Sequence, residues 1–289
     1  MATALASAEP AAAEVMEIAD DVLGFSLSGL MDVGPEDELT ATKNAQPALL
    51  THSIAVFRVI QQRIGPVSFA AGHSLGEFSA HVAAGTLDFE DALRAVRLRG
   101  ELMFEAGQQR PGTMAAILGL KAEAVESVCA EVSAGVCVPA NFNSPGQVVV
   151  SGDLAGIEEV LELAKAAGAK RVVKLKVSGA FHSPLMQPAA EGLSEHLDGI
   201  SFLDPRHPVL SNATAEAVTS GDAARRLLVQ QLTSPVRWDT SIAAMLRGGA
   251  DRFMELGPGK VLCALNRRNA KGVPCSAFGT SDDLVTLER

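Results

Sequence analysis

The pentapeptide Gly72-His73-Ser74-Leu75-Gly76 has the residue types of a nucleophile elbow, G-x-S-x-G. It follows the apolar run 67–71 and precedes a run of helix-forming residues at 77–84. A serine on a sharp turn between a strand and a helix presents its hydroxyl away from the backbone, and the following N–H, from Leu75, can bind an oxyanion. The alternative interpretation is a tight glycine turn in which Ser74 only caps the helix.

A serine hydroxyl is a weak nucleophile near its ordinary pKa, so it needs a neighbouring base. Among the six histidines, His182 lies in the segment 178–184, where a small predicted domain returns to a larger one. A loop that crosses between two domains is a typical place for a cleft residue. We therefore predict His182 as the base, with a structural loop histidine as the alternative. The other five histidines lie beside the serine, in predicted helices or in a predicted loop: His52, His73, His81, His196 and His207.

The imidazole of such a pair is usually oriented by a third group. No Asp or Glu lies in an obvious acid loop between Ser74 and His182. Either a distant carboxylate or a backbone carbonyl must therefore orient the ring, and the residues alone leave both open.

Arg99 is a candidate for binding an anionic substrate. It lies in a predicted helix at 88–107, close to an apolar stripe that contains Ala92, Val96 and Met103. A guanidinium that points inward needs an anion, and its planar fork suits a carboxylate bound through two hydrogen bonds. The alternative is a solvated arginine on the outer face of the helix.

The order of predicted elements indicates an α/β protein with two lobes. Segment 108–178 reads as βαββαβ, which is typical of a ferredoxin-like domain. On either side, helices alternate with short apolar strands at 67–71, 209–211 and 253–256, which favours a mostly parallel sheet covered by helices on both faces. We predict a discontinuous, α/β-hydrolase-like large domain at 1–107 and 179–289, with the small domain 108–178 inserted and a cleft between them.

Composition narrows the class of protein. The chain has 289 residues and a net charge of −10, which argues against nonspecific nucleic-acid binding. No apolar run approaches the length of a membrane span, and the four cysteines form no C-x-x-C pair. We expect reduced cysteines, a cytoplasmic location and a monomer, with no metal, cofactor or membrane partner.

Several stretches, in order over nearly the whole chain, resemble the malonyl-CoA:acyl-carrier-protein transacylase family of fatty-acid synthesis. They are also similar to the related acyltransferase domains of polyketide synthases. The matching stretches are Asn44-Ala45-Gln46-Pro47-Ala48-Leu49, Gly72-His73-Ser74-Leu75-Gly76-Glu77, Arg97-Leu98-Arg99-Gly100, Asn141-Phe142-Asn143-Ser144-Pro145-Gly146-Gln147, Gly179-Ala180-Phe181-His182-Ser183, Gln231-Leu232-Thr233-Ser234-Pro235-Val236-Arg237-Trp238 and Glu255-Leu256-Gly257-Pro258-Gly259-Lys260.

The resemblance implies that the protein transfers a malonyl group from malonyl-CoA to the phosphopantetheine thiol of acyl carrier protein, without a cofactor. It implies that Ser74 forms a malonyl ester, that His182 acts as base and then as acid, and that the backbone carbonyl of Gln231 orients His182. It also implies that Arg99 pairs with the malonyl carboxylate and that Phe181 leaves little room for an α-methyl group. The remaining substrate-binding residues that it implies are His73, Leu75, Asn141 and Asn143.

The sequence departs from the family at its N-terminus. Family members begin with a strand and a Gly-Gln-Gly-Ser-Gln loop, whose first Gln supplies the second oxyanion donor. No Gly-Gln-Gly occurs in this sequence, and the opening Met1-Ala2-Thr3-Ala4-Leu5 matches the residues that come after this loop in the family. We expect a truncated or misassigned start, and the alternative is a genuine short form with weak or no activity. For the function, the alternatives are a polyketide-pathway acyltransferase, a thioesterase or esterase on the same dyad, and an inactive carrier-binding homologue.

Overall fold

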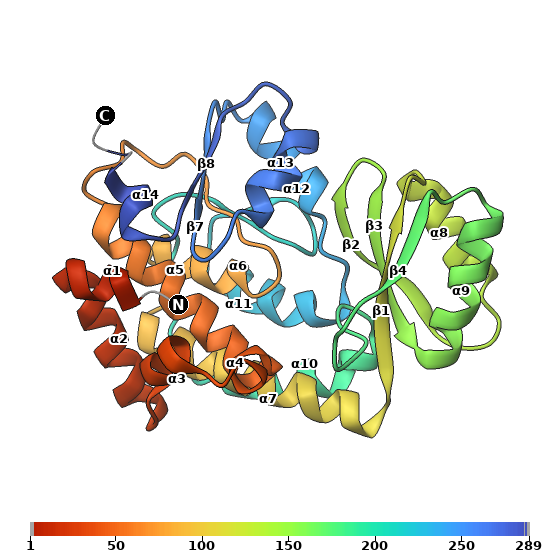
Figure 1. Ribbon diagram of the computed structural model, residues 1–289, viewed down its shortest axis with the longest axis horizontal. Coiled ribbons are helices and arrows are strands. Elements are labelled where there is room, and N and C mark those ends of the chain that lie inside the picture. Colours follow the sequence, from red (N-terminus) through yellow and green to blue (C-terminus); the bar gives the residue numbers. More distant parts are fainter. Residues whose placement is uncertain (1–2, 286, 288–289) are drawn as a thin grey trace.

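The computed structural model describes residues 3–285 and residue 287 and shows two lobes (Figure 1). A small lobe around a four-stranded sheet stands beside a larger lobe that is rich in helices (Figure 1). Met1 and Ala2, which belong to the opening stretch that resembles the family, lie outside the described residues.

The small lobe has the predicted ferredoxin-like topology. Its strands pair antiparallel in the order β2-β3-β1-β4. Apolar residues of the strands and of the two helices form a separate core that includes Ile117, Val150 and Ile157. The elements are β1 (Gly112–Leu118), α8 (Ala122–Glu131), β2 (Cys137–Ser144), β3 (Gln147–Asp153), α9 (Leu154–Ala166) and β4 (Arg171–Lys174). The final strand, β4, pairs with β1 from Arg171 to Lys174.

The first half of the large lobe is helical. Its helices are α1 (Thr3–Ala8), α2 (Pro10–Leu23), α3 (Leu27–Val33), α4 (Glu36–Thr40), α5 (Thr42–Ile60), α6 (Gly76–Ala83) and α7 (Phe89–Gln109). Helix α5 packs against both α2 and α7 at the centre of the main core. The Asp88 carboxylate caps α7 by accepting the Glu90 N–H, as its residue type predicts. Gly24 ends α2 in a left-handed conformation.

The second half of the large lobe alternates helices with short strands. Its elements are η1 (Pro184–Met186), α10 (Gln187–Leu197), β5 (Val209–Leu210), β6 (Ala217–Val218), α11 (Gly221–Gln230), η2 (Gln231–Thr233), α12 (Trp238–Arg247), β7 (Phe253–Leu256), α13 (Val261–Asn269), β8 (Cys275–Phe278) and α14 (Ser281–Val285). Strands β7 and β8 are parallel. Within the described part of the chain, no helix combines the length and apolar character that a membrane span requires.

The α/β class is confirmed, but one local prediction was wrong. The segment 67–71 is not a full strand, because only Ala70 forms a bridge, to Val209, and a strand needs continuous pairing. The segment 32–44 contains α4 and the start of α5. Pro47 lies in the second turn of α5.

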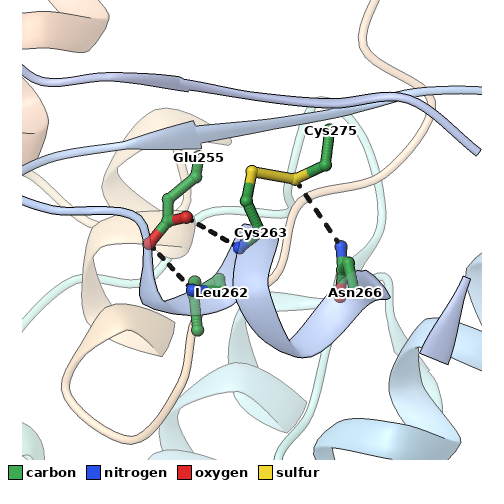
Figure 2. Close-up of a disulfide and its surroundings, with 5 residues drawn as sticks. All are labelled: Glu255, Leu262, Cys263, Asn266 and Cys275. Carbon is green, nitrogen blue, oxygen red and sulfur yellow. Dashed lines mark hydrogen bonds between the residues drawn. A yellow bond between two sulfur atoms is a disulfide. The ribbon is translucent and has the colours of Figure 1, made fainter. Parts of the chain in front are cut away.

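The expectation of four reduced cysteines is also wrong, because Cys263 and Cys275 form a disulfide (Figure 2). The bond joins the first turn of α13 to the start of β8, which the parallel β7–β8 pairing brings together. The Glu255 carboxylate fixes the same turn by accepting the N–H groups of Leu262 and Cys263 (Figure 2). A spacing of twelve residues without a C-x-x-C motif gave no sign of this contact.

Replacing Cys263 should destabilise the protein. The disulfide closes a loop with a sequence separation of 12. Without this cross-link the unfolded chain gains conformational entropy, which lowers the free energy of unfolding by about 3 kcal/mol. Urea unfolding of Cys263→Ser should show this loss. Cys129 forms no disulfide, so Cys129→Ser keeps the cross-link and should not lose the stability that it provides. An unchanged free energy of unfolding in Cys263→Ser would contradict the prediction.

Candidate active site

The serine turn has the strained geometry of a nucleophile elbow. Ser74 has a φ of 53°, in the left-handed region that non-glycine residues rarely adopt. A Cβ on Gly72 would lie 1.9 Å from the Gly76 carbonyl carbon, so the turn excludes any side chain at position 72. A Cβ on Gly76 would meet no atom within 4 Å, so the turn leaves room for a side chain at that position. Helix α6 begins at once and directs its N-terminus toward the turn.

Ser74 and His182 form a hydrogen-bonded pair. The Ser74 Oγ lies 2.8 Å from His182 Nε2, although the residues are 108 positions apart. His182 Nδ1 lies 2.9 Å from the backbone carbonyl oxygen of Gln231. A carbonyl can only accept, so Nδ1 carries the proton and Nε2 is free to accept the serine proton. In this structure the group beside the imidazole is therefore a backbone carbonyl rather than a carboxylate.

Burial keeps the His182 ring neutral. Loss of hydration, together with the positive charge of Arg99, lowers the pKa of His182 to about 3. Hydrogen bonds from the ring to the backbone at Gln231 and Ser234 oppose this shift but do not reverse it. The imidazole is thus in its basic form at neutral pH.

The Arg99 guanidinium lies against the Ser74 hydroxyl, and Arg99 is 1% exposed. Its Nη2 donates to Ser74 Oγ at 3.1 Å and to Gln231 Oε1 at 2.9 Å, and its Nη1 donates to Gln46 Oε1 at 2.5 Å. Its Nε is buried and has no acceptor among the described residues. Burial lowers the pKa of Arg99 only to about 10, so the group stays charged. A cation with a spare donor beside a nucleophile suits an anionic substrate group.

Two further buried residues hold this arrangement, and sequence reasoning missed both. The Asn212 side chain accepts the Ser74 N–H at 2.7 Å and donates to the Gly72 carbonyl at 2.8 Å. Glu77 Oε2 accepts the Gln231 side-chain amide at 2.6 Å and the Asn212 N–H at 3.1 Å. Burial raises the pKa of Glu77 to about 7, against the opposing effects of these bonds and of the Arg99 charge. Glu77 could have been noticed as a charge directly after the elbow, but nothing in the sequence links Asn212 to Ser74.

A cavity of about 380 Å³ opens beside the dyad, between the two lobes. His182, Phe142 of β2 and Arg237 are among its lining residues, and the Arg237 guanidinium carbon lies 5.8 Å from the centre of the Phe142 ring. Arg237 was not among the predicted site residues. A second cavity, of about 500 Å³, lies beside the disulfide between α13 and β8, and the dyad does not line it.

The other predicted residues surround the dyad at different depths. His73 Nε2 bonds to Asn143 Oδ1 at 2.8 Å, and the His73 ring lies 5.7 Å from the Trp238 ring. Asn141 is buried where β2 bridges to the large lobe, and Phe181 packs half-buried beside the base.

The Leu75 N–H is the donor that the elbow motif assigns to an oxyanion. It donates to no acceptor among residues 3–285 and 287, so it can bind an oxyanion that forms at Ser74. Leu75 lies in the turn immediately before α6.

Replacing each glycine of the elbow with alanine should have different effects at the two positions. Gly72→Ala places its Cβ inside the backbone of the turn, so we expect a loss of stability beyond the ~1–3 kcal/mol of ordinary overpacking and little reactive serine. Gly76→Ala is the matched control and should fold and react normally. Thermal unfolding and labelling of Ser74 with a fluorophosphonate measure both. A Gly72→Ala protein that labels at the wild-type rate would refute this geometry.

The His182 ring should resist protonation. A histidine is the neutral base above its pKa and a cation below it, so a lowered pKa keeps the base available as the pH falls. In protein labelled with ¹⁵N histidine, the His182 signals should stay those of the neutral Nδ1–H tautomer down to about pH 4, as for a buried group. Arg99→Ala removes a nearby positive charge and should raise the midpoint. A midpoint near 6.5 in the wild type would contradict the buried geometry.

A family model, similar protein sequences and similar solved structures all indicate the same family. The family model described as "Acyl transferase domain" matches residues 1–280. The "Malonyl CoA-acyl carrier protein transacylase" of Bacillus subtilis (strain 168) is 48% identical over 261 residues, covering 90% of this chain and 82% of the relative. An acyl carrier protein S-malonyltransferase structure from Vibrio cholerae has a TM-score of 0.96 at 40% identity, covering 99% of this chain and 94% of that one.

A malonyl-transacylase solved in complex with a type II polyketide synthase acyl-carrier protein has a TM-score of 0.95 at 42% identity, covering 99% of this chain and 94% of its own. The match of fold extends through both lobes, and the sequence identity is spread over most of the chain. The chain therefore belongs to the acyl transferase domain family, among relatives named malonyl CoA-acyl carrier protein transacylase.

Proposed function

We propose that this protein transfers a malonyl group from malonyl-CoA to the phosphopantetheine thiol of acyl carrier protein through a malonyl ester of Ser74, in fatty acid biosynthesis. One observation carries the proposal: a serine hydroxyl touches both a neutral imidazole, at 2.8 Å, and a buried guanidinium, at 3.1 Å. The first contact suits acyl transfer, and the second suits an acyl group that carries a carboxylate. The names of the relatives and structural neighbours support the same reaction.

In the first half-reaction, His182 Nε2 takes the Ser74 proton as Oγ attacks the thioester carbonyl. The Leu75 N–H donates a hydrogen bond to the oxyanion as it forms. The N-terminus of the adjacent helix also stabilises this negative charge. The intermediate collapses as the carbon–sulfur bond breaks, and His182 returns the proton to the departing CoA thiol. The products are malonyl-Ser74 and free CoA.

In the second half-reaction the carrier thiol replaces CoA in the cleft. His182 takes the thiol proton, sulfur attacks the ester carbonyl, and the carbon–oxygen bond to Ser74 breaks. The proton passes from His182 to Ser74 Oγ, which restores the enzyme. The Gln231 carbonyl accepts the Nδ1–H of His182 through both half-reactions. Nδ1 therefore keeps its proton, and only Nε2 gains and loses one.

Arg99 supplies the selectivity for a charged acyl group. A malonyl carboxylate can bind the free Nε–H and take the Nη2 donor that rests on Ser74 in this structure. The exchange moves a hydrogen-bond donor from the nucleophile to the substrate, so it also releases the Ser74 hydroxyl. Phe181, next to the base, would restrict an α-substituent, and Asn141, Asn143 and His73 would line the cleft around the acyl chain.

Arg99 and acyl charge can be tested together. Arg99→Ala should reduce malonyl transfer to holo-acyl carrier protein about a hundredfold, because loss of a buried charge partner costs several kcal/mol. Transfer of an acetyl group, which has no carboxylate, should not fall by this factor. Arg94→Ala, on the exposed face of the same helix, is the matched control.

Labelled malonyl and acetyl donors measure these rates. If Arg99→Ala reduced the rates of malonyl and acetyl transfer equally, the proposed role of Arg99 would be wrong. Hydrolysis faster than a tenth of carrier-dependent transfer would favour a thioesterase, and binding of carrier without any acylation would favour a non-catalytic homologue. A preference for a type II polyketide carrier over a fatty-acid carrier would favour the polyketide pathway, which the carrier complex of one neighbour also suggests.

We also propose a monomer in the cytoplasm, with both lobes of the site supplied by one chain. The Cys263–Cys275 disulfide is the feature that tests this location, because disulfides are rare in the reducing cytoplasm. Alkylation of thiols at the moment of cell lysis would report whether these cysteines are oxidised in the cell, and light scattering would report the mass in solution.

A further inference from the structure

Beneath the dyad lies a buried polar cluster that the proposed reaction steps do not use. Glu77, Asn212 and the Gln231 side chain are each at most 1% exposed. They come from three separate places: helix α6, the turn after β5 and the start of η2. Burying a carboxylate is costly unless hydrogen bonds or a charge partner offset the loss of hydration, and Glu77 accepts two such bonds.

We propose that Glu77 is a positioning residue that aligns the nucleophile and the base at the same time, through Asn212 and Gln231. The inference rests on the proposed roles of Ser74 and His182, but not on malonyl being the acyl group. Glu77 itself contacts neither reacting atom, and His182 bonds to the Gln231 carbonyl rather than to the carboxylate.

The connection to the nucleophile runs through Asn212. Glu77 Oε2 accepts the Asn212 backbone N–H, and the Asn212 side chain then closes a ring between the Ser74 N–H and the Gly72 carbonyl. The ring holds the two residues that set the direction of the elbow. Ser74 has a positive φ, a conformation that costs of order 1–3 kcal/mol and persists only where the surroundings impose it.

The connection to the base runs through Gln231. Its side-chain NH₂ faces two acceptors, Glu77 Oε2 at 2.6 Å and the Ser74 carbonyl at 2.9 Å. Its Oε1 therefore faces Arg99 Nη2, while its backbone carbonyl receives His182 Nδ1. A reversed amide would set donor against donor at Arg99 and acceptor against acceptor at Glu77, so the carboxylate fixes the amide in one direction. One residue thus links the alignment of His182, Arg99 and Ser74.

Glu77→Gln tests this role with little change of shape. An amide at position 77 loses the charge that strengthens both bonds and leaves its NH₂ without an acceptor, since Glu77 Oε1 has no partner among the described residues. We expect the rate of Ser74 modification by a fluorophosphonate, in which the Oγ–P bond forms as the P–F bond breaks, to fall at least tenfold, as for misaligned reacting groups. Asn212→Ala should have the same effect.

The readouts separate positioning from stability. The affinity for CoA, measured in a Ser74→Ala background, should change by less than about threefold, because CoA carries no malonyl carboxylate for Arg99 to bind. Glu255→Gln is the matched control, because that carboxylate also accepts two N–H groups but caps α13, away from the dyad. It should leave the modification rate unchanged. Folded Glu77→Gln protein that reacts at the wild-type rate would overturn the proposal.

Failure to fold is also decisive. If Glu77→Gln does not fold, Asn212→Ala gives the same test with Glu77 in place. If neither folds, the cluster serves the fold, and the positioning role is refuted. Wild-type protein that reacts with the fluorophosphonate but transfers no malonyl would refute the proposed function and leave this inference intact.

Discussion

The hydrogen bonds of Gln231 are the constraint on which the site depends. Its backbone carbonyl orients His182, and its side chain connects Arg99, the Ser74 backbone and Glu77. Gln231 begins the short turn η2 directly after α11, so its position depends on how α11 packs in the large lobe. Because the carbonyl takes the place of a carboxylate, the imidazole is fixed without a carboxylate bonded to it, and burial together with the Arg99 charge keeps it neutral.

The same arrangement brings two buried ionisable side chains close to Ser74. Arg99 and Glu77 each lie within the other's field, and neither is exposed to solvent that could screen it. Arg99 retains an unused donor, so the positive charge is only partly satisfied in the free protein. In the proposed mechanism an incoming carboxylate fills this donor, which would give a physical reason for preferring a charged acyl group over a neutral one.

The small lobe is joined to this centre through its own backbone. The segment around Asn141 in β2 forms a parallel bridge with Val236, reinforced by the Phe142 N–H to Val236 carbonyl bond at 2.9 Å. Asn143, further along β2, bonds to His73 in the elbow, and its carbonyl accepts the Asn269 amide from α13. The lobes therefore meet at the sides of the nucleophile, where the cavity opens.

Local patterns predicted much of this structure from the sequence. The βαββαβ order, the Asp88 cap and the elbow depend on residue type and spacing, and each lies where the pattern placed it. Predicting that Ser74 pairs with His182 required the elbow motif and also the position of His182, where the chain passes from the small domain back to the large one.

The features that the sequence did not reveal depend on contacts between distant segments. Asn212 is 138 residues from the Ser74 N–H that it binds, and its own neighbours carry no catalytic pattern. The disulfide likewise depends on the pairing of β7 with β8, which spacing alone does not predict. The segment 67–71 has strand-like residues but only one paired neighbour, so composition overstated its regularity.

The most direct test of this mechanism is to trap the acyl-enzyme. Mixing the protein with labelled malonyl-CoA, without carrier, and mapping the label by peptide mass spectrometry should place one malonyl group on the peptide that contains Ser74. Adding holo-acyl carrier protein should then move the label to the carrier thiol. Label on another residue, or transfer to the carrier with no labelled Ser74 at any time, would contradict the covalent mechanism built on the Ser74–His182 pair.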